Sequence, residues 1–205
     1  MASQTDIYNA ALTIMGEETV LSPGDTSTAA KTLTANYDMI RLGELRRYRW
    51  KFSLSRQVIP ALTNLPTGSP YSYAYQMPNQ CLKVLDINGL RQTLGSYRYR
   101  SGLEKLYEFQ DGALVTNIAA PITLHFVKDI TVTTSFDPLF VNALAAALAR
   151  KCAYRLTQSN SIVTLCEKEY KKAIAEATLM DAIEKLPEGE AEDSWILSEN
   201  CWISL

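Results

Sequence analysis

The spacing of hydrophobic residues changes twice along the chain, from a helical period to a strand period and back again. Up to about residue 46, apolar residues recur at three- and four-residue steps, which is typical of helices with one buried face. We expect a first helix that is capped by Ser3 and ends at Gly16, and a second helix over about 27–46. The predicted buried stripe of the second helix comprises Ala30, Leu33, Tyr37 and Ile40.

The segment RRYRWKFSLSR, residues 46–56, interleaves basic residues with aromatic ones. From Arg47 onward the alternation is strict, and Arg47, Arg49 and Lys51 fall on one side together with Ser53 and Ser55. A period of two predicts a half-buried strand with a solvated basic face. The side predicted to enter the core comprises Tyr48, Trp50, Phe52 and Leu54. An alternative interpretation is a stripe that binds nucleic acid, because such grooves also combine cations with aromatic rings.

The middle of the chain, residues 56–130, keeps the strand period. Short β-branched or aromatic runs alternate there with breaks that contain Pro, Gly and Asn, which predicts about six strands, mostly antiparallel. Asn88-Gly89 and Asp111-Gly112 are the strongest hairpin turns, because both residue types tolerate a positive φ.

The helical period returns after residue 135. Asp137 is a suitable N-cap and Pro138 suits the first helical position, so a helix is expected to begin there. This helix is apolar almost all round and is therefore predicted to be the most buried, with Phe140 and Leu144 in the core. A last helix is expected over about 161–185. Its coiled-coil-like seam comprises Val163, Cys166, Tyr170, Ala173, Ala177 and Met180.

The order of these elements predicts an α+β fold. Helices from the two ends, residues 1–47 and 136–186, are expected to pack into one bundle, because each has an apolar face that needs a partner. Residues 48–135 then form an antiparallel, β-rich insertion that projects from the bundle, and 187–205 form an extended C-terminal tail.

The tail combines an acidic, glycine-containing linker with two apolar clusters. Exposed tryptophan is unfavourable in water, so these clusters are expected to be buried somewhere. We favour docking on a neighbouring molecule, with the tryptophans as anchors; the alternative is a tail folded back onto its own core. The predicted docking residues are Trp195, Ile196, Leu197, Trp202, Ile203 and Leu205.

Bulk composition narrows the choice of function classes. The chain of 205 residues has a net charge of −2 and a pI near 5.5, whereas a protein that coats nucleic acid normally has a basic excess. No apolar run reaches the roughly 20 residues of a membrane span, and the N-terminus lacks the features of a secretory signal. We therefore expect synthesis in a cytoplasm, no membrane partner and reduced cysteines.

Candidate chemistry is sparse. The single histidine, His125, is expected to be structural, and the four cysteines show no CxxC pair, so no metal site is predicted. The absence of GxSxG, P-loop and GxGxxG motifs argues against a catalytic triad and against nucleotide binding, and no cofactor is expected. A pair of carboxylates that degrades glycans stays open as an alternative, because such pairs form only in space.

Three stretches together resemble the tail tubular protein A family, the head-to-tail adaptors of short-tailed bacteriophages. They are YDMIRLGELRRYRWKFSLSR, YSYAYQMPNQCLKVLDI and FDPLFVNALAAALARKCAYRLTQS. The matching motifs are Trp50-Lys51-Phe52, then Tyr73-Ala74-Tyr75, Met77-Pro78 and Cys81-Leu82, and finally Phe136 to Phe140. The set keeps the family's order up to about Lys185, and the tail beyond Pro187 carries no family motif.

The resemblance implies a structural virion protein rather than an enzyme. Such adaptors form a dodecameric ring between the portal protein and a tail nozzle of the tail tubular protein B type, at the head-tail junction of the virion. The viral double-stranded DNA leaves through the lumen without sequence-specific binding, and synthesis takes place in the host bacterial cytoplasm. In such a ring we expect Arg47, Arg49 and Lys51 at subunit contacts, with acids such as Asp38 or Glu44 as candidate partners.

Overall fold

The computed structural model describes residues 2–91 and 106–185. In these residues the helices are α1 (Gln4–Met15), α2 (Thr28–Arg47), α3 (Pro138–Thr157) and α4 (Asn160–Glu184), with two 3-10 helices, η1 (Lys51–Ser53) and η3 (Thr133–Ser135). The strands are β1 (Leu54–Ile59), β2 (Tyr73–Gln76), β3 (Cys81–Ile87), β4 (Glu108–Gln110), β5 (Ala113–Thr116) and β6 (Ile122–Lys128).

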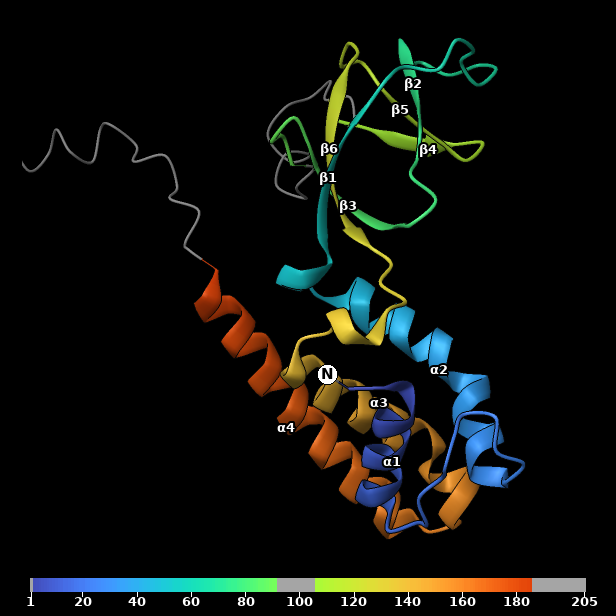
Figure 1. Cartoon of the computed structure of the whole chain (residues 1–205). Helices are drawn as coiled ribbons and strands as arrows, with labels where there is room; N and C mark the ends of the chain where they lie inside the picture. Colours follow the sequence, from blue (N-terminus) through green and yellow to red (C-terminus); the bar gives the residue numbers. More distant parts are fainter. Residues whose placement is uncertain (1, 92–105, 186–205) are drawn as a thin grey trace, which may run out of the picture.

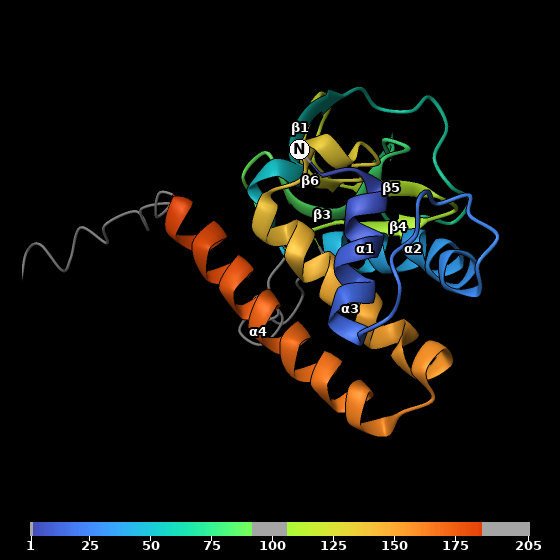
Figure 2. The same cartoon turned by 60° about the horizontal axis from the view of Figure 1, so that its bottom comes forward.

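The helices from the two ends of the chain pack together, and the strands lie between them in sequence and beyond them in space (Figure 1). The predicted α+β architecture is confirmed. Helix α3 is the central helix, because the three most extensive helix–helix contacts are those of α3 with α4, α1 and α2. The second view shows α4 running alongside α3 for most of its length (Figure 2).

Local signals fix the ends of these helices as the sequence predicts. The Ser3 side chain and the Asp6 side chain each bond the other's backbone N–H, which satisfies donors that the first turn of α1 leaves free. Gly16 ends α1 with φ 75°, a conformation that glycine adopts without strain. Asp137 accepts a hydrogen bond from the backbone of Leu139 at 2.8 Å and begins α3.

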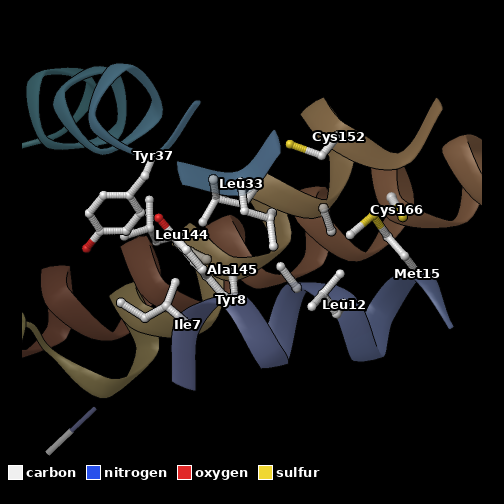
Figure 3. Close-up of a cluster of buried hydrophobic side chains, with 14 of the residues drawn as sticks. Ile7, Tyr8, Leu12, Met15, Leu33, Tyr37, Leu144, Ala145, Cys152 and Cys166 are labelled. Atoms are coloured by element: carbon white, nitrogen blue, oxygen red, sulfur yellow. The ribbon is translucent and has the colours of Figure 1, made fainter. Parts of the chain in front are cut away.

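The bundle has one main hydrophobic core (Figure 3). Leu12 of α1, Leu33 of α2, Leu144 of α3 and Cys166 of α4 are all buried there. The predicted stripe of α2 is also correct, with Ile40 half-buried at its edge. Removing this apolar surface from water is the main force that holds both ends of the chain together.

Aromatic rings fill the end of this core that faces the sheets. The ring of Phe140 lies 5.0 Å from that of Trp50 and 5.0 Å from that of Phe52. Of the residues predicted for the core, Trp50, Phe140, Leu144 and Tyr170 are buried and Phe52 is half-buried. Edge-to-face and tilted packing of this kind contributes beyond the apolar area that it buries.

The strands form two antiparallel three-stranded sheets with the orders β1-β6-β3 and β2-β5-β4. Side chains from both sheets, among them Ile59, Tyr75, Leu114 and Phe126, share a second hydrophobic core that is separate from that of the bundle. The sheets therefore form a body of their own above the helices (Figure 1).

Both predicted hairpin turns are present. Asn88 and Gly89 have φ 53° and 81°, and Asp111 and Gly112 have φ 49° and 77°. Two consecutive positive φ angles suit the right-handed twist of the flanking strands, and the second turn joins β4 to β5.

The strand predicted from Arg47 onward is wrong in its first half. Arg47 is the last residue of α2, residues 51–53 form η1, and the ladder with β6 begins only at Leu54. The backbone at Tyr48 and Trp50 is extended but has no strand partner, so the alternation reflects extended chain against the core rather than a sheet. Ser53, expected on the solvated face beside the cations, is buried, and its hydroxyl is satisfied by donating to the carbonyl of Trp50.

The predicted seam of α4 is correct for its first part and wrong at Met180. Cys166, Tyr170 and Ala177 are buried, whereas Met180 is 45% exposed. Helix α4 has 25 residues and α3 has 20, so the last turns of α4 run past the start of α3 and lose their cover.

Replacing Leu144 with alanine is expected to lower the free energy of unfolding by about 2–5 kcal/mol, because it opens a cavity in the core. Leu165→Ala provides the matched control, since Leu165 is 48% exposed on α4 and its loss is expected to change stability by about 0.5 kcal/mol at most. Denaturant unfolding followed by circular dichroism measures both, and equal effects would contradict the assignment of the core.

Candidate docking surfaces between the bundle and the sheets

The chain leaves the bundle through a short connection between α2 and β1 whose path is set by hydrogen bonds. The indole N–H of Trp50 donates to the carbonyl of Glu44 at 2.9 Å, which folds the chain back over the last turn of α2. The hydroxyl of Ser53 then donates to the carbonyl of Trp50 at 2.9 Å. With Trp50 buried between them, Arg49 and Lys51 lie at the surface next to the end of α4.

Arg47, a predicted ring contact, is anchored to its own chain. Its guanidinium donates to the Tyr170 hydroxyl and lies 4.0 Å from the carboxylate of Glu44. The Tyr170 hydroxyl in turn donates to Glu44 Oε1 at 2.7 Å, and Arg150 lies 4.1 Å from the centre of the Tyr170 ring. The candidate acid Glu44 is therefore used inside the subunit, where it ties α2 to α4.

The surroundings of Tyr170 raise the pKa of its phenol. Burial raises the pKa of Tyr170 to about 12, and the hydrogen bond to Glu44 acts in the same direction. Burial also raises the pKa of Tyr37 to about 12. Both phenols therefore stay neutral to a higher pH than an exposed tyrosine does.

Residues 49–51 are fastened to the end of α4. The ammonium of Lys51 lies 3.5 Å from the Glu184 carboxylate, and its backbone N–H donates to Asp181 at 2.8 Å. The Lys185 ammonium donates to the carbonyl of Arg49. The Arg49 side chain is exposed and has no hydrogen bond or ion pair within the described part of the chain.

A second set of contacts, made by Arg41, joins α2 to the segment that leads from the sheets back to the bundle. The sequence analysis did not predict these contacts. Arg41 is only 4% exposed and donates to the carboxylate of Asp129 and to the carbonyl of Ile130, and it also pairs with Asp38 at 3.3 Å. Burial alone would lower the pKa of the Arg41 guanidinium, but the contacts with Asp129 and Asp38 outweigh it and raise the pKa. The available signal was the position of Arg41, four residues after Tyr37 on the buried stripe of α2.

A groove of about 360 Å³ lies beside the end of α4. Its floor is apolar and is formed by Phe52, Phe136, Leu139 and Met180. Its rim carries the charged groups Lys51, Asp137, Asp181 and Glu184. Each of these has a partner already: Asp137 caps α3, Asp181 accepts from the Lys51 backbone, and Lys51 pairs with Glu184.

An open polar hollow of about 810 Å³ lies on the sheet β1-β6-β3. His125 forms part of its wall, and its Nδ1 lies 2.9 Å from Asp86 Oδ2 on the neighbouring strand β3, which holds the imidazole in place. Arg56 lies directly opposite His125 in the strand register and lines the same hollow.

Three of the four cysteines lie in the described residues. Cys81, Cys152 and Cys166 are free thiols there. Within residues 2–91 and 106–185, no cluster of three or more His, Cys, Asp or Glu side chains is placed to hold a metal ion, and no helix is long and apolar enough to cross a bilayer. The predicted docking residues from Trp195 to Leu205 lie outside the described residues.

Neither protein-family models nor curated proteins give a match to this chain. The resemblance to tail tubular protein A therefore depends on the ordered motifs alone. In the structure these motifs mark packing positions, since Trp50, Tyr75, Phe136 and Phe140 are all buried.

Replacing Tyr170 with phenylalanine is expected to destabilise the protein by about 1–3 kcal/mol at neutral pH, because the buried Glu44 carboxylate loses a donor. The same change is expected to make the free energy of unfolding fall less steeply as the pH rises from 10 towards 12. A phenol with a raised pKa contributes stability below pH 10 that is lost as the pH rises towards 12, since the unfolded chain releases the proton first.

Thermal unfolding between pH 8 and 12 measures both effects. Tyr154→Phe is the matched control, because Tyr154 is exposed on α3. Tyr37 contributes to the alkaline slope of every variant, so the slope is reduced in Tyr170→Phe rather than abolished. Identical slopes for the two variants would refute the role of the Tyr170 hydroxyl.

Proposed function

We propose that the protein is a head-to-tail adaptor, a structural virion protein that forms a ring joining the portal to the tail nozzle and lining the DNA exit channel. The observation that supports the proposal is that the molecule has two distinct parts. Helices from both ends of the described chain form a bundle, and the sheets form a separate body that projects from it (Figure 1). A subunit held between two larger assemblies needs two such surfaces. The ordered motifs that resemble those of the tail tubular protein A family support the same function.

In the ring each subunit uses two different surfaces against its neighbours, a heterologous contact that closes by rotation. The bundle builds the ring wall and meets the portal, and the sheets reach towards the nozzle. A twelve-fold ring, as in the family that the motifs resemble, encloses a lumen for double-stranded DNA. The modest net charge of −2 favours passage of DNA over adhesion to it.

The basic stretch supports a protein contact better than a nucleic-acid contact. Arg47 and Lys51 are engaged with Tyr170 and Glu184 of their own chain, which leaves few cations available for phosphates. All three side chains are exposed, but only that of Arg49 has no partner within the described residues, and we assign it to the subunit contact. A nucleic-acid-binding module would instead show binding that weakens steeply with salt.

The tail beyond Pro187 supplies the anchor for assembly in this proposal. Trp195 and Trp202 dock on the portal or on the adjacent subunit, and as hot spots they contribute roughly 2 kcal/mol or more each.

Charge reversal of Arg49 tests the ring contact. Arg49→Glu is expected to reduce ring formation on the portal at least tenfold while leaving the fold intact, because its side chain has no partner within the described residues of its own chain. Lys83→Glu makes the same charge change on the exposed face of β3 and serves as the control. Sedimentation velocity of each protein alone and mixed with the phage's portal protein gives the mass, and equal ring yields would contradict the assignment.

Truncation after Pro187 tests the anchor. The shortened chain is expected to keep its unfolding transition, because the described bundle ends at Lys185, yet to bind the portal at least tenfold more weakly. Surface plasmon resonance against immobilised portal measures the affinity. Portal binding that is undiminished by the truncation would refute the anchor while leaving the ring contact at Arg49 as a separate question.

A further inference from the structure

The groove at the end of α4 continues into an exposed apolar surface. Leu179 and Ile183, on the last turns of α4, are 60% and 68% exposed, and Met180 between them also lines the groove. Three large apolar side chains within five residues of a helix end form a patch of the kind that soluble proteins normally cover. Within the described residues nothing covers it.

The chain itself carries a suitable occupant next to this groove. The described part ends at Lys185, whose neighbour Glu184 forms part of the groove's rim. Ten residues further on comes the cluster Trp195-Ile196-Leu197. Ten residues span up to roughly 35 Å, far more than the single helical turn between Lys185 and the groove. Pro187 and Gly189 supply turn residues at the start of this stretch.

The charges between Lys185 and Trp195 also favour a position of this stretch beside the groove. The stretch between Lys185 and Trp195 contains Glu188, Glu190, Glu192 and Asp193 and no basic residue. It begins beside Arg49, whose carbonyl accepts from Lys185 and whose guanidinium is exposed. The acids on the groove's rim are paired with Lys51, Lys185 and backbone donors, so the cation without a partner in this part of the described chain is Arg49.

We infer that the groove at the end of α4 binds the Trp195-Ile196-Leu197 cluster of the same chain. The groove volume of about 360 Å³ is within the range of pockets that enclose small organic ligands, which suits an indole with an aliphatic neighbour. A short linker gives the cluster an effective concentration of the order of millimolar at its own groove, so the isolated chain fills this site before any partner does.

This inference does not depend on the adaptor function, because it concerns the isolated chain. If the protein is an adaptor, the groove holds the Trp195 cluster until the portal or a neighbouring subunit competes for it. A ring contact at Arg49 would then also release the acidic linker, since both use the same side chain.

Acrylamide quenching of tryptophan fluorescence tests the inference on the full chain. In a Trp202→Phe background the remaining tryptophans are Trp50, which is buried, and Trp195. The signal of a Trp195→Phe/Trp202→Phe variant gives the contribution of Trp50 for subtraction. Trp195 is expected to be protected, and Met180→Glu is expected to raise its quenching constant at least threefold.

The matched control is Leu165→Glu, which makes the same change at a similarly exposed leucine near the opposite end of α4 and is expected to leave Trp195 protected. Ile183→Glu repeats the test should Met180→Glu lower the melting temperature. A quenching constant for Trp195 equal to that of free tryptophan in the unmutated groove would overturn the inference, as would equal effects of Met180→Glu and Leu165→Glu.

Two further measurements separate the possible occupants. Protection that is constant over a hundredfold range of protein concentration supports the same chain, whereas protection that appears only with a doubling of mass assigns the groove to a second copy and overturns the inference. In a Trp195→Phe background, protection of Trp202 that Met180→Glu removes would assign the groove to the second cluster instead.

Discussion

The structure depends on how the chain crosses twice between the bundle and the sheets. On the way out, Trp50 packs against Phe140 and bonds the carbonyl of Glu44, so the departing chain is part of the helical core. On the way back, the buried Arg41 binds Asp129 and Ile130, which lie between β6 and η3. Because both crossings are attached to α2, the sheet body is held at a defined place on the bundle although the two hydrophobic cores are separate.

Much of this architecture could be read from periodicity and from local signals. Ser3, Gly16 and Asp137 each act through hydrogen bonds with residues at most four positions away, so their effect is visible in sequence. The alternation from Arg47 does not distinguish a strand from what is present, because an extended segment packed against a core has the same period of two. Whether such a segment finds a ladder partner is decided by residues far away in the chain, here by β6.

The candidate surfaces were less accessible to sequence reasoning. The sequence indicated Arg47, Arg49 and Lys51 as exposed cations but not that two of them are bound to Tyr170 and Glu184 of the same chain. The groove joins η1, the start of α3 and the end of α4, and no pattern within one element reports such a meeting. Its one sequence signal was Met180, an apolar residue that continues the seam of α4 beyond the point where α3 can cover it.

The strands lie in sequence between the first two and the last two helices of the bundle, and this order has a consequence for biosynthesis. Arg41 and Asp129 are separated by 88 positions, so α1 and α2 leave the ribosome well before the helices that bury them. During that interval the apolar faces of the first two helices are exposed, a state in which chains associate wrongly or are bound by chaperones. A late, long-range closure of this kind slows folding. The nascent polypeptide therefore reaches the described fold only after α3 and α4 have left the ribosome.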